Sequence, residues 1–129
     1  MIAVDTSALM SILQQEPSAA ACAEALGEHT DLVISAVTLA EALVVAGRRG
    51  IGAHVRRLME SLPLMVIEAT GETATRVDAI YARWGKGAHP AKLNIVDCFA
   101  YEVATAYDCP LLFIGDDFSQ TDVKRAIQN

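Results

Sequence analysis

Four short apolar runs divide the chain, and within each run the apolar residues are continuous rather than alternating with polar ones. A strand that is buried on both faces carries apolar side chains at every position, whereas a strand with one wet face alternates. We therefore predict four buried strands. The runs span residues 2–4, 32–34, 64–67 and 111–114.

The segments between these runs have the periodicity and the terminal residues of helices. Ser35 and Asn94 each precede such a segment, and both side chains accept hydrogen bonds at helix N-termini. With two helical segments in each connection, the predicted order is β-α-α-β-α-α-β-α-α-β. Four of the expected helices can be delimited, at residues 19–26, 36–45, 73–84 and about 95–107.

Helical connections, rather than tight hairpin turns, predict parallel strands with helices packed on both faces of the sheet. We expect an α/β fold in three layers, α/β/α, around a central parallel sheet of four or five short strands. A length of 129 residues suits one core, so residues 1–129 are expected to form a single domain.

Composition narrows the class of protein. Hydrophobic residues make up 53% of the chain, which excludes an intrinsically disordered protein. The apolar runs fall well short of the roughly 20 residues that cross a bilayer, so no membrane association is expected. The first residues lack the basic start of a secretory signal, which favours the cytoplasm. The three cysteines lack the spacing of a zinc site or a disulfide framework, so we expect buried thiols.

The charge balance argues against binding of nucleic acid by overall charge. Ten Lys and Arg against sixteen Asp and Glu give a formal net charge of −6. All ten cations lie between Arg48 and Arg125. Any surface that faces phosphate is therefore expected to be local.

Acidic residues follow the predicted strands. Asp5 comes directly after the first run, and Asp116 and Asp117 follow the fourth. Glu41 lies two turns into the helix after the second run, and Asp97 lies in the first turn of the last helix. Ligands of open α/β sheets bind at the carboxyl ends of the strands. Carboxylates from four elements are thus expected to meet at this edge.

Carboxylates that converge in a partly dehydrated cleft repel one another unless a cation compensates their charge. Mg²⁺ or Mn²⁺ suits a site made only of oxygen ligands. Such an ion can orient a phosphodiester, activate a bound water and stabilise the leaving oxygen. The acids therefore point to phosphodiester chemistry.

Each acid also has a purely structural alternative. Asp5 fits the N-cap of the following helix, and Asp97 fits the N3 partner of an Asn94 cap. Glu41 lies among apolar residues, where an acid is uncommon unless it is paired, bound to metal or at the edge of the apolar stripe. The two aspartates after the fourth run also fit an ordinary turn.

The order of several motifs resembles the PIN-domain ribonuclease toxins of VapBC toxin–antitoxin systems. The motifs are Val-Asp-Thr-Ser-Ala at 4–8, Thr-Leu-Ala-Glu at 38–41 and the segments 89–101 and 110–122. The most specific parts are Leu-Asn-x-x-Asp-Cys-Phe at 93–99 and Gly-Asp-Asp-Phe at 115–118. The resemblance covers the whole chain in the family's order.

This resemblance implies a Mg²⁺-dependent endoribonuclease, with Mn²⁺ as a substitute, that cleaves cellular RNA such as tRNA or rRNA and so inhibits translation and growth. It also implies a cognate VapB-type antitoxin that holds the enzyme inactive, and a homodimer. The family's metal-binding and catalytic acids carry over to Asp5, Asp97, Glu41 and, as the fourth, Asp116. Members differ in spacing before the Phe, so Asp117 is the alternative.

Other polar residues have supporting roles in this interpretation. Thr6 or Ser7 would bind a metal-bound water or the scissile phosphate, or only cap a helix. Asn94 would orient Asp97 or cap its helix. Arg48, Arg49, Arg56 and Arg57 are candidates for phosphate contacts, with a solvated helix surface as the alternative. For contact with RNA we favour Lys86 and Lys92. His89 is a further candidate, with an ordinary histidine of a surface loop as the alternative.

Two other functions have to be weighed. In an aspartyl-phosphate phosphotransferase or a receiver-like domain, Asp5 would be phosphorylated, but Ser7 stands where the phosphatases carry a second Asp, and no Lys follows the last run as receivers require. The other alternative is a catalytically inactive PIN module that only binds a partner. Failure to bind Mn²⁺ would favour that alternative.

Overall fold

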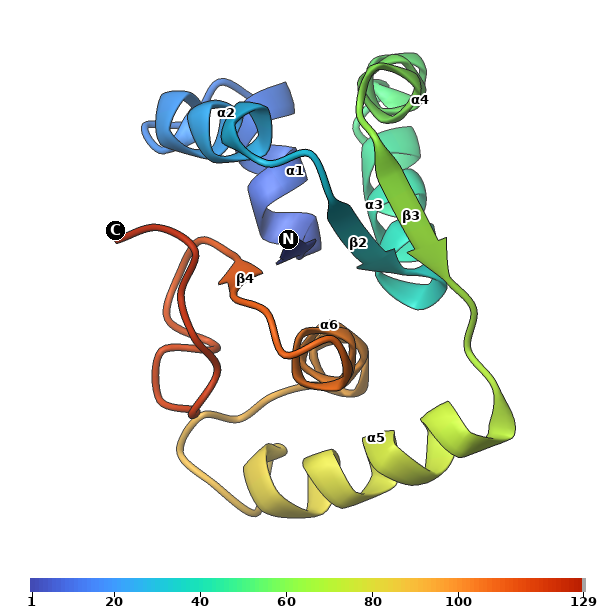
Figure 1. Ribbon diagram of the computed structural model, residues 1–129, viewed down its shortest axis with the longest axis vertical. Coiled ribbons are helices and arrows are strands. Elements are labelled where there is room, and N and C mark those ends of the chain that lie inside the picture. Colours follow the sequence, from blue (N-terminus) through green and yellow to red (C-terminus); the bar gives the residue numbers. More distant parts are fainter. Residues whose placement is uncertain (129) are drawn as a thin grey trace.

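The computed structural model describes residues 1–128, in which one parallel sheet lies between two layers of helices (Figure 1). The elements are β1 (Ile2–Val4), α1 (Thr6–Leu13), α2 (Ala19–Glu28), β2 (Leu32–Ser35), α3 (Ala36–Arg48), α4 (Gly52–Ser61), β3 (Leu64–Ile67), α5 (Gly71–Trp84), α6 (Ile95–Ala106) and β4 (Leu111–Leu112). The predicted α/β fold, with parallel strands between paired helices, is confirmed. None of the helices in this part of the chain is long and apolar enough to cross a membrane.

The four strands lie in the order β3-β2-β1-β4, and every neighbouring pair is parallel. In the register of the sheet, Ala3 pairs with Val33 on one side and with Leu111 on the other. The carboxyl ends of β1, β2 and β4 therefore meet at one edge. The residues that follow these strands are brought together there.

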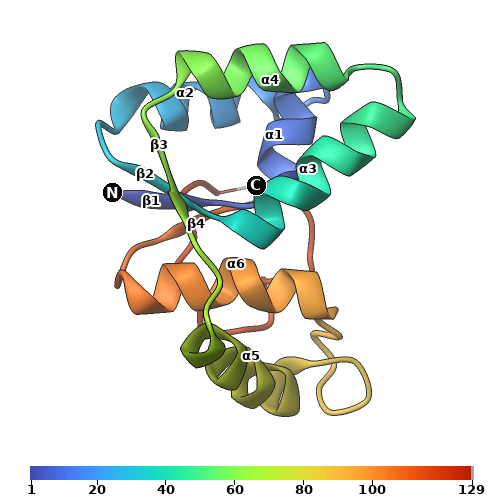
Figure 2. The same cartoon turned by 90° about the vertical axis from the view of Figure 1, so that its right-hand side faces the viewer.

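Helices α1 to α4 cover one face of the sheet, and α5 and α6 cover the other (Figure 2). Successive strand residues point to opposite faces. Accordingly Ala3 and Val33 pack with α6, whereas Ile2, Val4 and Ile34 pack in the core that includes α1 and α2. Continuous apolar runs are thus explained by two cores, one on each side of the sheet. The three cysteines are buried free thiols, as predicted.

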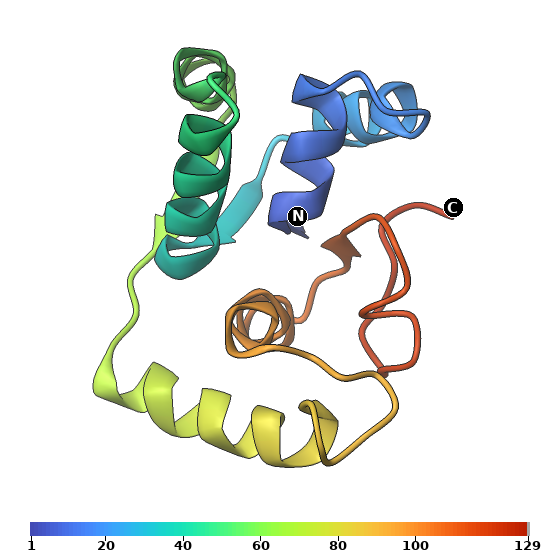
Figure 3. The same cartoon turned by 180° about the vertical axis from the view of Figure 1, so that it is seen from behind.

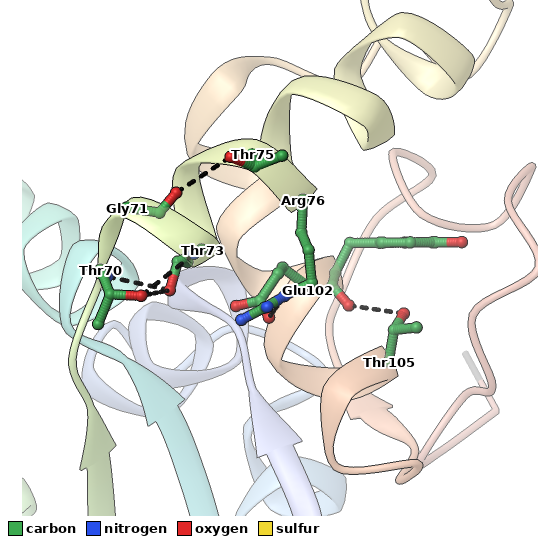
Figure 4. Close-up of polar contacts among 8 residues, drawn as sticks. Thr70, Gly71, Thr73, Thr75, Arg76, Glu102 and Thr105 are labelled. Carbon is green, nitrogen blue, oxygen red and sulfur yellow. Dashed lines mark hydrogen bonds and ion pairs between the residues drawn. The ribbon is translucent and has the colours of Figure 1, made fainter.

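Polar contacts cap the N-terminus of helix α5 and join the helix to α6 (Figure 4). Thr70 Oγ1 accepts a hydrogen bond from the Thr73 backbone N–H at 3.2 Å, and Thr73 Oγ1 accepts one from the Thr70 N–H at 3.0 Å. This reciprocal cap starts the helix at Gly71, two residues before the predicted start. Arg76 Nε donates to Glu102 Oε2 at 3.1 Å, which joins α5 to α6.

Two of the predicted strands differ from expectation. The fourth ends at Leu112 rather than at 114, because the Ile114 N–H donates to Ser7 Oγ at 3.0 Å and Phe113 turns to pack against Phe118. The third is not buried: Met65 and Val66 are 48% and 47% exposed. Strand β3 lies at the edge of the sheet, where helices cover it only in part.

Candidate active site

A cleft of about 380 Å³ opens at the carboxyl edge of the sheet. Its walls come from α1, α3, the start of α6 and the segment after β4. Five acids line it, together with one cation, Arg49. The acids are Asp5, Glu16, Glu41, Asp97 and Asp117.

Asp5 is buried, and hydrogen bonds of both its backbone and its side chain fix its position. Its backbone N–H donates to Leu112 O at 3.0 Å, which continues the pairing of β1 with β4. Its carboxylate Oδ2 accepts hydrogen bonds from the Ser7 backbone N–H at 3.1 Å and from Ser7 Oγ at 2.7 Å. Asp5 is therefore the N-cap of α1 and a wall of the cleft at once.

The hydroxyl groups of Thr6 and Ser7 both donate hydrogen bonds to other atoms of the protein. Thr6 Oγ1 donates to Thr38 O at 3.1 Å, which ties α1 to α3. Ser7 Oγ donates to Asp5 and accepts from the Ile114 N–H. A hydroxyl has one proton to donate. Neither side chain is thus arranged to donate to a phosphate, and both hold the frame of the cleft.

Asp97 and Asn94 form a reciprocal cap at the start of α6. Asn94 Oδ1 accepts from the Asp97 N–H at 2.8 Å, and Asp97 Oδ2 accepts from the Asn94 N–H at 3.0 Å. The two interpretations weighed for Asn94, a helix cap and a residue that orients Asp97, describe the same contact. Asp97 is half-buried and faces the cleft while it caps the helix.

Glu41 reaches the cleft from the middle of α3. It is half-buried, and it lies one turn before Val45 and two turns before Arg49 on the side of the helix that lines the cleft. No ion pair involves Glu41 within residues 1–128. An acid in this apolar helix is therefore at the edge of the apolar stripe and directed to the other carboxylates.

Two of the carboxylates in the cleft, Asp5 and Asp97, have a raised pKa. The pKa of Asp97 is raised to about 7, mainly by burial and also by the charges of Asp5, Asp117 and Glu41, while the hydrogen bond from the Asn94 backbone lowers it. Burial also raises the pKa of Asp5, as does the charge of Glu41, while the hydrogen bonds from Ser7 lower it. The cleft therefore concentrates acids, and Arg49 is the one cation among residues 1–128 that lines it.

Of the two adjacent aspartates after β4, Asp117 lines the cleft and Asp116 does not. Asp116 is exposed and is not among the residues that line the cleft. Phe118 is buried, with its ring centroid 5.2 Å from that of Phe113. This contact fixes the turn after β4 so that the residue before Phe118 meets the other acids.

The residues favoured for contact with RNA do not line the cleft either. The His89 ring packs edge-on against Trp84 at 4.7 Å, and its Nδ1 accepts from the Ala91 N–H at 3.0 Å. Lys86 and Lys92 are exposed beside it. The cation at the cleft is instead Arg49, with Gln14 next to it. In the sequence, the four-residue spacing of Glu41, Val45 and Arg49 indicates that Arg49 lies on the same side of the helix as Glu41. No sequence pattern indicates that Gln14 lies at the cleft.

The donor set fits a hard divalent cation in its chemistry. All the acidic side chains that line the cleft are carboxylates, and the pKa values of Asp5 and Asp97 are raised first by burial and also by neighbouring negative charge, which a cation would offset. Across residues 1–128, no group of three or more His, Cys, Asp or Glu side chains is drawn together closely enough to hold an ion. The carboxylates thus share a cleft without forming a closed coordination set.

Comparison with known proteins identifies the family. The PIN domain family model matches residues 2–124. Ribonuclease VapC36 of Mycobacterium tuberculosis is 41% identical over 94% of this chain and 90% of its own length. Ribonuclease VapC30 of the same species is 36% identical over 93% of this chain and 94% of its own length.

Solved structures share the fold. The crystal structure of M. tuberculosis VapC20, described as a sarcin–ricin loop cleaving toxin, superposes with a TM-score of 0.78 at 16% identity and covers 95% of this chain and 96% of that one. A toxin–antitoxin complex from Klebsiella pneumoniae gives a TM-score of 0.73 at 20% identity, with 95% and 93% covered. Together with the family match, these similarities show that the chain belongs to the PIN-domain family and is an endoribonuclease of its VapC toxin group.

Proposed function

We propose that Asp5, Glu41, Asp97 and Asp117 hold Mg²⁺ in the cleft and that the chain hydrolyses RNA there. The observation that carries the proposal is the convergence of five acids on one cleft, in which burial raises the pKa of Asp5 and Asp97 and three further acids lie beside them. When bound, the ion would lower the pKa of a water molecule and stabilise the leaving oxygen. Mn²⁺ would substitute because it accepts the same oxygen ligands.

The side chains prepare this site in different ways. Ser7 donates two hydrogen bonds to Asp5, one from its N–H and one from its hydroxyl, and so favours the charged form that binds a cation. Asn94 fixes the position of Asp97 on the first turn of α6. Binding of a cation releases the proton that Asp97 holds near neutral pH.

The substrate that we propose is structured cellular RNA, such as tRNA or rRNA, and its cleavage would inhibit translation and growth in the cytoplasm. The similarity in fold to a toxin that cleaves the sarcin–ricin loop supports this class of substrate. A metal-dependent route requires no nucleophilic side chain and does not use the 2′-hydroxyl of RNA. The expected products carry a 5′-phosphate and a 3′-hydroxyl.

We also propose a VapB-type antitoxin as the partner and a homodimer as the assembly. A basic side chain of an antitoxin would be attracted to the acidic cleft, and a solved structure of this fold comes from a toxin–antitoxin complex. Exposed apolar side chains, including Val44 of α3 and Met65 and Val66 of β3, offer surface for such contacts.

Cleavage of total tRNA and rRNA by purified protein without antitoxin tests the enzymatic function. We expect discrete cuts with Mg²⁺ or Mn²⁺, none in EDTA, and a loss of at least about 100-fold in Asp5→Asn and Asp97→Asn. Cuts that persist in EDTA and leave cyclic phosphates would contradict the proposal. Binding of Mn²⁺ without cleavage of any RNA would favour the inactive partner-binding module.

A further inference from the structure

Arg49 differs in charge from everything else that lines the cleft. Among residues 1–128 it is the only cation there, beside five acids. Its Nη1 donates to Oε1 of Gln14, and no ion pair joins it to an acid in this part of the chain. Because its partner Gln14 is a neutral amide, the positive charge of Arg49 remains available to bind an anion.

The position of Arg49 relative to the acids follows from helix geometry. Glu41, Val45 and Arg49 are four residues apart, so they lie along one side of α3, and all three line the cleft. At 1.5 Å per residue, Arg49 lies about 12 Å along the helix from Glu41. The guanidinium therefore stands at the outer end of the cleft.

Gln14 brings α1 to the same place. Gln14 and Arg49 each follow the last residue of their helix, so the bond between them joins the ends of α1 and α3. These helices extend from β1 and β2 on the same side of the molecule (Figure 3). The negative ends of two helix dipoles favour a cation here. The arrangement holds Arg49 without neutralising it.

The free donors of Arg49 match a phosphate. A guanidinium has five N–H donors in a planar fork, and Gln14 occupies one nitrogen. The remaining donors suit the oxygens of a phosphodiester. The acids of the cleft repel an RNA backbone, whereas the charge of Arg49 attracts it. Resting on the proposed function, we propose that Arg49, oriented by Gln14, binds a backbone phosphate of the RNA that flanks the cleavage site.

Binding of a fluorescent single-stranded RNA of mixed sequence, measured in EDTA at several salt concentrations, tests this assignment. Arg49→Ala is expected to weaken binding about tenfold and to reduce the slope of log K against log salt by about 0.7, the value for one phosphate contact. Lys124→Ala is the control, because Lys124 is an exposed cation that does not line the cleft, and its replacement gives the same change in net charge. It should leave affinity and slope unchanged.

A double-mutant cycle separates the positioning role of Gln14 from a structural one. Gln14→Ala should weaken RNA binding several-fold in the wild type and should have no further effect when Arg49→Ala is already present. Arg49→Lys should keep the salt slope but not the full affinity, because it retains the charge without the planar fork. Additive effects of the two alanine substitutions would show that Gln14 does not act through Arg49.

The same variants distinguish a failure of the Arg49 assignment from a failure of the proposed enzymatic function. If the wild type cleaves RNA with Mg²⁺ while Arg49→Ala and Lys124→Ala both match it in KM and in salt slope, the assignment of Arg49 is wrong and the enzymatic function stands. If the wild type shows no metal-dependent cleavage, the enzymatic function itself fails. Absence of RNA binding by the wild type in EDTA also overturns the assignment.

Discussion

Ser7 Oγ donates a hydrogen bond to Asp5 Oδ2 at 2.7 Å while it accepts one from the Ile114 N–H at 3.0 Å. One hydroxyl thereby connects the carboxyl ends of the two strands β1 and β4 at the cleft. It also stabilises the charged form of a buried carboxylate whose pKa burial raises. The uncharged side chain of Ser7 thus lowers the pKa of Asp5 and favours its charged form.

Ser7→Ala should destabilise the fold and weaken cation binding together. The Ile114 N–H loses its partner, which costs about 1–3 kcal/mol, and the pKa of Asp5 rises further because one hydrogen bond to the carboxylate is lost. Chemical denaturation and Mn²⁺ titration measure the two effects. Ser18→Ala is the control, since Ser18 makes no capping hydrogen bond with its side chain at α2. Equal behaviour of the two variants would contradict this account.

Two reciprocal caps of the same kind allow stability to be separated from activity. Asn94→Ala at α6 and Thr70→Ala at α5 should each cost about 1 kcal/mol of stability. Only Asn94→Ala should also lower cleavage, by about 10- to 100-fold, because its partner Asp97 lies in the cleft. Kinetics at matched folded fractions check this. A similar loss of activity in Thr70→Ala would show that stability alone is responsible.

The ion pair between Arg76 and Glu102 should be important for stability. The Glu102 side chain is 4% exposed, and Arg76 Nε lies 3.1 Å from its Oε2. Arg76→Ala leaves a buried carboxylate without this partner, so we expect a loss of about 1–3 kcal/mol in denaturant unfolding. The exposed pair of Lys124 with Asp108 is the comparison, and Lys124→Ala should change stability little. Comparable losses in both would refute the distinction.

The metal-free protein should become less stable as the pH rises from about 4 to about 7. The pKa of Asp97 is raised to about 7 in the folded state, from an ordinary value of 3.8. In this window the folded state binds more protons than the unfolded state, so the free energy of unfolding falls with increasing pH and levels off above it. Urea unfolding in EDTA measures the trend. Asp97→Asn should flatten it, and an identical pH slope in the variant would contradict the pKa assignment.

Sequence reasoning located the strands and the acids because both are local signals. Continuous apolar runs marked β1 and β2, and the end of a parallel strand is where Asp5 has to lie. The exposure of Met65 and Val66 was missed because an apolar run does not encode the place of its strand in the sheet. Strand order depends on long-range packing, which the run itself does not contain.

The sequence alone does not decide between Asp116 and Asp117, for a related reason. The two are adjacent in a turn, and the one that faces the cleft depends on where β4 ends and how Phe118 packs. The sequence predicts a longer strand because residues 113–114 are apolar. Only the hydrogen bond from the Ile114 N–H to Ser7 shows that the pairing ends earlier. Arg49 was one of four arginines named as candidates for phosphate contacts, and only the folded structure shows that it lines the cleft.

Titration of the metal-free protein with Mn²⁺ by calorimetry, in buffers of different ionisation enthalpy at pH 6, tests the central claim that the cleft carboxylates hold a cation. We predict binding with release of about one proton per ion, because Asp97 is protonated at this pH. Both binding and proton release should be lost in Asp97→Asn, and binding in Asp5→Asn. Absence of binding, or binding that both variants retain in full, would contradict the account.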